Sequence, residues 1–123
     1  MITGGNATVF VTNMDRAVDF YTNVLGMKLR MRAADHWAEV EAGPDLVIGL
    51  HPDTTSPMKA GTSGSIQIGL TVSDPIDDVV ATLVKRGVAF GGPVVDDGPV
   101  RLAFFKDLDG NVLYLVELAG ATT

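Results

Sequence analysis

Residues 11–27, VTNMDRAVDFYTNVLGM, return in altered form at residues 72–88 as VSDPIDDVVATLVKRGV. Each copy contains a strand end, a short polar turn, a helical stripe of apolar residues and a closing glycine. Val18 matches Val79 and Gly26 matches Gly87 at the same offset of 61 residues. One half of the chain therefore repeats the other half.

Both copies carry start and stop signals for a helix. In the first copy, Asn13 is placed to cap the helix and Gly26 to end it. In the second copy, Asp74 is the expected cap, Pro75 takes the first helical position and Gly87 ends the helix. The repeated pattern predicts a strand followed by a helix in each half.

Three extended segments follow each predicted helix. They read KLRMRAA, HWAEVEA and DLVIGLH in the first half, and VAFGGPVV, VRLAFFKD and NVLYLVEL in the second. Turn residues such as glycine, proline and aspartate separate them. We predict an α+β fold with two βαβββ modules in tandem, module one at 5–52 and module two at 65–119, joined by a connector at 53–64 within a single domain, 1–123.

The composition narrows the classes of function. The 123 residues are 46% hydrophobic and 20% charged, which is typical of one globular domain. The net charge of −6 repels phosphate backbones, so nucleic acid is not an expected partner. The absence of cysteine excludes disulfides and thiolate chemistry. No segment is long and apolar enough to cross a membrane, and we expect a soluble, cytoplasmic protein.

Three stretches together resemble the vicinal oxygen chelate superfamily, which includes glyoxalase I, bleomycin resistance proteins and extradiol dioxygenases. They are VTNMDRAVDFYTNVLGMKL, IGLTVSDPIDDVVATLVKRGV and FFKDLDGNVLYLVE, in that order. The resemblance covers the chain from Asn6 to Leu118. It implies paired βαβββ modules that form an incomplete barrel around a ligand cleft, commonly within a homodimer.

The resemblance also allows a test for a metal site. In the metal-dependent members, histidine, glutamine or glutamate side chains hold a divalent ion, and the matching positions here are Asn6, Gly49, Gln67 and Tyr114. None of these is a histidine or a carboxylate. Neutral amides bind such ions weakly, and a protonated phenol is a poor donor. We therefore expect no metal and no other cofactor.

Strand periodicity predicts which side chains line the cleft. Asn6 and Gln67 occupy matching positions, where their amides either satisfy each other or buried water, or bind the polar atoms of a ligand. Thr8, His51 and Tyr114 share the concave face on the same argument.

Three further candidates come from residue type. Trp37, the only tryptophan, lies among polar neighbours and is suited to stacking against a flat ligand. Phe105 is either a core residue or a ligand contact. Arg101 pairs with an acidic ligand or with a neighbouring aspartate such as Asp96. The candidate ligand-binding set is Asn6, Thr8, Trp37, His51, Gln67, Arg101, Phe105 and Tyr114.

Two functions fit these observations. The first is a metal-free protein that binds or sequesters an aromatic or amphipathic small molecule, as in the drug-resistance branch of the superfamily. The second is a lyase, isomerase or dioxygenase that uses an atypical metal site or acid–base chemistry by His51, Glu39 or Tyr114. No catalytic residue is assigned from the sequence.

Overall fold

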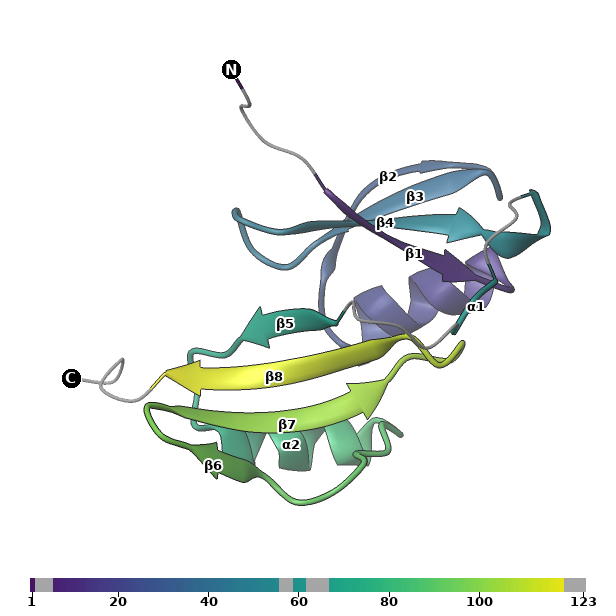
Figure 1. Ribbon diagram of the computed structural model, residues 1–123. Coiled ribbons are helices and arrows are strands. Elements are labelled where there is room, and N and C mark those ends of the chain that lie inside the picture. Colours follow the sequence, from purple (N-terminus) through teal and green to yellow (C-terminus); the bar gives the residue numbers. More distant parts are fainter. Residues whose placement is uncertain (2–5, 56–58, 62–66, 119–123) are drawn as a thin grey trace. The chain divides into compact units, whose positions relative to one another are not determined.

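The computed structural model describes residues 1, 6–55, 59–61 and 67–118 (Figure 1). The chain forms two compact units, one of Met1–Ser63 with Leu108–Asn111 and one of Gly64–Asp107 with Val112–Thr123. Part of the predicted connector, 56–58 and 62–64, lies outside the described residues, as do the predicted module ends at 5, 65 and 119. The module boundaries therefore stay predictions.

In its described residues the first unit contains one mixed sheet, the helix α1 with a π-helical continuation, and a short 3-10 helix, Asp53–Thr55. Its elements are β1 (Ala7–Val11), α1 (Met14–Asp19), β2 (Lys28–Ala33), β3 (Trp37–Glu41) and β4 (Val47–Pro52). The strands lie in the order β1-β4-β3-β2, with β1 parallel to β4 and the other pairs antiparallel. The first and last strands of the module are thus neighbours.

The second unit repeats this topology. Its elements are β5 (Ile68–Thr71), α2 (Ile76–Lys85), β6 (Val95–Asp97), β7 (Val100–Lys106) and β8 (Val112–Leu118), and its strand order is β5-β8-β7-β6. The predicted α+β fold with two βαβββ modules is confirmed. The strands form two separate four-stranded sheets and no closed barrel. The ligand cleft stays a prediction.

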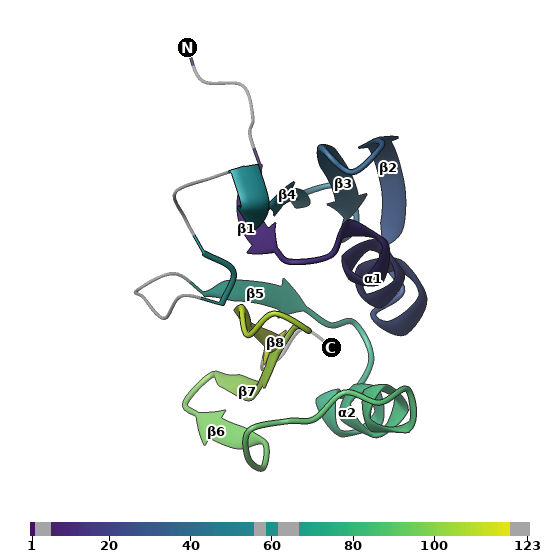
Figure 2. The same cartoon turned by 90° about the vertical axis from the view of Figure 1, so that its right-hand side faces the viewer.

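Each sheet is buried on one face only. In the first unit α1 packs on β3 and β4, and in the second α2 packs on β7 and β8 (Figure 2). The residues buried on the helix faces alternate along the strands. They are Val9, Val11, Ala38, Val40, Ile48 and Leu50 in the first sheet, and Ile68, Leu70, Ala103, Phe105, Leu113 and Leu115 in the second. We call the opposite face of each sheet its open face.

The start and end of the first helix follow the predicted signals. The side chain of Asn13 accepts a hydrogen bond from the backbone N–H of Arg16 at 3.0 Å, as expected for a cap. After Asp19 the helix continues as a π-helical turn, Phe20–Val24. Gly26 then takes a positive φ of 80°, which a glycine adopts without strain, and the helix ends there.

The start of the second helix differs from the prediction. Pro75, not Asp74, is the N-cap residue, and it offers no side-chain cap. Instead, the backbone N–H of Ile76 donates to Oε2 of Glu117 on β8 at 3.1 Å. The carboxylate of Glu117 thus satisfies a free donor at the helix start from a position 41 residues away.

The turn between β7 and β8 belongs to the first unit. The side chain of Asn111 donates to the carbonyl of Phe10 at 2.9 Å and accepts from the N–H of Gly61 at 3.2 Å. Asp109 accepts hydrogen bonds from the N–H and the hydroxyl of Thr12. We call these contacts the 108–111 clasp. They hold the end of β1, where Phe10 lies, against the turn between β7 and β8.

Candidate functional site

Three aromatic side chains gather on the open face of the first sheet. The ring of His51 lies 5.4 Å from the ring of Phe10 and 6.2 Å from that of Trp37, measured between centroids. Phe10 and His51 are opposite each other on the parallel pair β1 and β4, so the strand register brings them together. All three are half-buried, and they form a surface on which a flat molecule can stack.

Trp37 is held in place by a glycine and a carboxylate. A side chain at Gly49 would collide with the indole ring, so the ring lies directly over the bare backbone of β4. The indole N–H donates to Oε2 of Glu39 at 2.9 Å. Because both its face and its edge are fixed, Trp37 presents a preorganised aromatic surface.

Charged groups border the aromatic rings. Nε of Arg30 lies 3.6 Å from Oε1 of Glu39 and 3.9 Å from Oε1 of Glu41. Arg30 occupies a register shift between Leu29 and Met31, where two residues of β2 oppose one residue of β3. This bulge brings a cation to the open face, next to the carboxylate that holds Trp37.

The imidazole of His51 has one nitrogen engaged. Nδ1 lies 2.7 Å from the carbonyl of Pro52. Since a carbonyl oxygen only accepts, the neutral ring carries its proton on Nδ1 and leaves Nε2 as an acceptor. The imidazole of His51 is thus oriented by its contact with the carbonyl of Pro52, beside the aromatic rings.

The centre of the open face of the second sheet is apolar, with Thr71 and Lys106 at strand ends. The rings of Phe104 and Tyr114 lie 5.3 Å apart at an interplanar angle of 33°. The ring of Tyr114 covers Gly69, where an added side chain would collide with it. Leu102 and Val116 pair on the same face. Each sheet thus carries an aromatic ring over a glycine on its open face.

The predicted polar anchors lie at strand starts. Asn6 and Gln67 each stand one residue ahead of a strand, and both side chains are exposed. Thr8 is exposed on β1 opposite Gly49. The alternative in which the two amides are buried and satisfy each other does not fit this exposure.

Arg101 and Phe105 do not lie on an open face. Arg101 is hydrogen-bonded to Asp96 at 2.7 Å and to Asp77 at 3.2 Å, so the salt-bridge alternative is correct for it. Phe105 is 2% exposed and packs against Phe90 on the helix face. Its neighbour Phe104 takes the open face instead, because adjacent residues of a strand point to opposite sides.

The sequence analysis did not predict two residues of the open faces, Arg30 on the first sheet and Phe104 on the second. Phe104 belongs to the run AFF, in which either phenylalanine fits either face. Arg30 sits in a bulge, and a bulge leaves no signal in the alternation of residue types.

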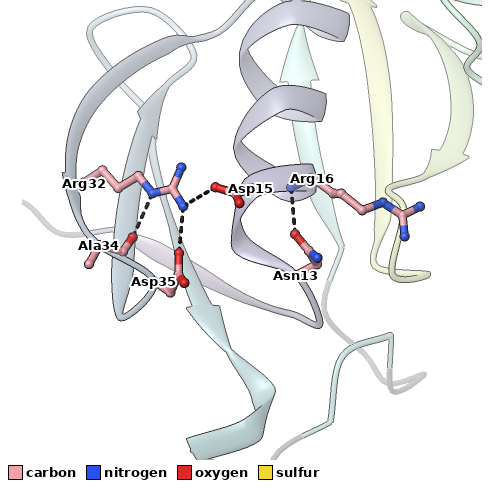
Figure 3. A network of polar contacts seen from close by, with 6 residues as sticks. All are labelled: Asn13, Asp15, Arg16, Arg32, Ala34 and Asp35. Carbon is pink, nitrogen blue, oxygen red and sulfur yellow. Dashed lines mark hydrogen bonds and ion pairs between the residues drawn. The ribbon is translucent and has the colours of Figure 1, made fainter.

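A second polar cluster lies beside the start of α1, and its members form hydrogen bonds with one another. The guanidinium of Arg32 donates to Asp15 at 2.7 Å, to Asp35 at 2.9 Å and to the carbonyl of Ala34 at 2.7 Å (Figure 3). The hydrogen bonds to Asp15 and Asp35 raise the pKa of Arg32. A cavity of about 340 Å³ here is lined by residues 12–15, 35–36, 52 and 54–55, none of which is a predicted site residue.

The residues present do not fit the superfamily's metal site. Gly49 offers no donor and is covered by an indole ring, and Tyr114 lies over Gly69. Within the described ranges, no group of three or more histidine, cysteine, aspartate or glutamate residues is placed to hold an ion. The side chains on this surface are able to stack and to form hydrogen bonds.

The comparisons with known proteins give family and fold. Residues 5–115 match the family model of the Glyoxalase/Bleomycin resistance protein/Dioxygenase superfamily. No curated protein matches the chain. Among the described residues, no helix is long and apolar enough to span a membrane.

Three solved structures illustrate the similarity. A superfamily member from Sphaerobacter thermophilus DSM 20745 is 28% identical, with a TM-score of 0.79 and coverage of 95% of this chain and 98% of that one. TnmS3, an antibiotic binding protein from Streptomyces sp. CB03234, is 29% identical, with a TM-score of 0.79 and coverage of 97% and 98%. TioX from Micromonospora sp. ML1, at 22% identity, a TM-score of 0.76 and coverage of 95% and 99%, shares the fold. The chain belongs to the glyoxalase/bleomycin resistance protein/dioxygenase superfamily.

Proposed function

We propose that this protein binds and sequesters an aromatic or amphipathic small molecule on the open face of its first sheet. The observation that carries the proposal is the preorganised ring of Trp37. This ring lies over Gly49, and its N–H donates a hydrogen bond to Glu39. Phe10 and His51 extend the aromatic surface. A site that is formed before the ligand arrives loses little side-chain entropy on binding.

The relatives support a binding function. TnmS3 is described as an antibiotic binding protein, and this chain matches it over nearly its whole length. Because one fold hosts many chemistries, the similarity alone does not assign the ligand. The aromatic surface of this chain adds the physical reason to expect a flat, largely apolar ligand, and we extend the proposal to antibiotic capture on that basis.

A thermal-shift screen with flat aromatic compounds tests the proposal. Binding at a ligand concentration one hundred times the Kd stabilises the folded protein by about 2.7 kcal/mol. We expect a rise in Tm that is lost in Trp37→Ala and kept in Val84→Ala, a matched truncation of an exposed apolar residue on α2. A rise of equal size in both variants would place the ligand elsewhere.

We also propose that capture needs no metal. Metal analysis of the purified protein, followed by Tm measurements with Ni²⁺, Zn²⁺, Mn²⁺ and Fe²⁺, tests this directly. We expect no stoichiometric ion and no large metal-dependent rise in Tm. A bound ion at one equivalent would contradict the proposal and favour an enzyme with an atypical site.

The second candidate function is acid–base catalysis by His51. The observation in its favour is the contact of Nδ1 with the carbonyl of Pro52, which leaves Nε2 able to accept a proton. If captured compounds are chemically altered, His51→Gln should abolish the turnover even at saturating ligand concentration, although it also weakens binding because the ring is part of the aromatic surface. Recovery of every captured compound unchanged would rule this function out.

We further propose a cytoplasmic homodimer. Sheet edges are available for association, because β2 and β6 are the outer strands of their sheets and carry the exposed side chains Leu29 and Val95. Sedimentation equilibrium should give twice the mass of the chain, and a monomer at all concentrations would refute this assembly.

Cell fractionation should place the protein in the cytoplasm, and recovery from another fraction would contradict that location.

A further inference from the structure

We propose that Arg30 selects the ligand, and that the ligand carries an uncharged oxygen acceptor, such as a ketone, at the edge of its aromatic system. This inference rests on the proposed function, since it concerns the ligand of the same open face. It assigns a specificity role to the residue that the β2 bulge carries.

The guanidinium of Arg30 differs from those of Arg32 and Arg101 in its contacts. Arg32 and Arg101 each donate hydrogen bonds of 2.7–3.2 Å to at least two acceptors. Arg30 instead makes loose ion pairs of 3.6 and 3.9 Å through Nε. Among the described residues these ion pairs are its only polar contacts. The N–H donors of Arg30 are therefore the ones available to a ligand.

A second feature of Arg30 is its position. The side chain of Arg30 is 53% exposed, whereas that of Glu39 is only 20% exposed and joins Arg30 to the indole of Trp37. A ring stacked on Trp37 would thus meet a guanidinium at its edge. Bulges commonly redirect a side chain in this way beside a functional surface.

A third feature is the charge around it. The guanidinium lies between two carboxylates, Glu39 and Glu41, so the local charge is negative even with Arg30 present. A ligand carboxylate would be repelled by this pair. A ligand cation would have to compete with Trp37 and Arg30 for the oxygens of Glu39, and with Arg30 for those of Glu41. A neutral oxygen acceptor gains a charge-assisted hydrogen bond without either cost.

Four probes built on one ring system test the inference: naphthalene, 2-acetylnaphthalene, 2-naphthoate and 2-naphthylmethylammonium. Binding is followed by quenching of the emission of Trp37, the only tryptophan of the chain, and checked by equilibrium dialysis. We expect the wild type to bind 2-acetylnaphthalene about tenfold more tightly than naphthalene. It should prefer 2-acetylnaphthalene over both charged probes as well.

The variant Arg30→Met should reduce the preference for the ketone to about twofold or less. Arg16→Met is the matched control, because Arg16 is exposed on α1 and its guanidinium points away from the Arg32 cluster (Figure 3). The control should keep the full preference. An unchanged Tm in both variants would show that folding is intact.

The possible failures are distinguishable. If Arg30→Met binds the ring system but keeps the full preference, the inference is wrong and the proposed function stands. If a charged probe binds most tightly, the assigned ligand class is wrong. If the wild type binds none of the four probes, the proposed function fails and the inference fails with it.

Discussion

On the open face of each sheet an aromatic ring lies over a glycine, but the two faces differ in the polarity of the side chains beside that ring. On the first, Trp37 covers Gly49, and on the second, Tyr114 covers Gly69. Beside Trp37 lie a histidine, two glutamates and an arginine. Beside Tyr114 lie Phe104 and aliphatic side chains.

The comparison separates architecture from recognition. A glycine under an aromatic ring recurs in both halves of the repeat because it allows a ring to lie flat on a pleated surface. The cluster of a histidine, two glutamates and an arginine beside the ring occurs in the first half only, where the bulge in β2 adds Arg30. We infer that the first face is suited to binding a ligand both by stacking and through polar groups at the edge of the ligand.

The largest expected effect is a loss of affinity for an aromatic ligand when the ring of the first open face is removed. Trp37→Ala should weaken the binding of 2-acetylnaphthalene at least thirtyfold, roughly 2 kcal/mol, since a buried aromatic anchor and its ordered neighbours are lost. Tyr114→Ala should leave it within about twofold of the wild type, because the proposed ligand lies on the open face of the first sheet. Calorimetry measures both variants without needing the tryptophan signal. Equal losses would mean that the two faces contribute alike.

The 108–111 clasp offers a comparison in stability. Asn111→Ala removes hydrogen bonds to the carbonyl of Phe10 and the N–H of Gly61, and should lower the free energy of unfolding by about 2 kcal/mol. We expect Tm to fall by roughly 8 °C, by differential scanning calorimetry. Because Phe10 stands on the first open face, ligand affinity should fall as well. A loss of stability with unchanged affinity would show that the clasp does not position this face.

Substitution of the two glycines tests whether ring placement matters equally on both faces. Gly49→Ala should displace the indole and break its hydrogen bond to Glu39, at a cost of about 1–2 kcal/mol in stability. The emission maximum of Trp37 should then shift to the red. Gly69→Ala should displace Tyr114 at a similar cost and leave the emission unchanged. A red shift in both variants would contradict the expectation that displacement of Tyr114 leaves the surroundings of Trp37 unchanged.

The smallest expected effect concerns the helices that cover the opposite faces. Asn13→Ala removes a local cap from α1 and should cost about 1 kcal/mol. Glu117→Gln keeps an acceptor for the N–H of Ile76 but removes its charge, and should cost about 0.5 kcal/mol. Urea denaturation measures both. A larger loss for Glu117→Gln would show that its ion pair with Arg101, at 3.7 Å, matters more than the cap.

Local signals in the sequence were sufficient for the topology. The repeated strand, helix and glycine pattern led to two βαβββ modules, and Asn13, Gly26 and Gly87 cap or end the helices as predicted. These features depend on residues within a few positions of one another. Local residue types are therefore enough to place them.

The remaining features depend on contacts between distant residues. The cap of α2 comes from Glu117 and not from the adjacent Asp74, because the N-cap position falls on Pro75. The sequence left Phe105 open between core and ligand surface because β7 carries aromatic residues on both faces, and the structure buries Phe105 on the helix face. The position of Arg30 depends on a register shift that only the pairing of β2 with β3 defines.

The most direct measurement of the central claim is the nuclear magnetic resonance signal of the single indole N–H. Titration of ¹⁵N-labelled protein with 2-acetylnaphthalene should shift the Trp37 indole signal and the backbone amide of Gly49 together, in a saturable way. Binding detected by dialysis while both signals stay unmoved would contradict the claim that the first open face holds the ligand.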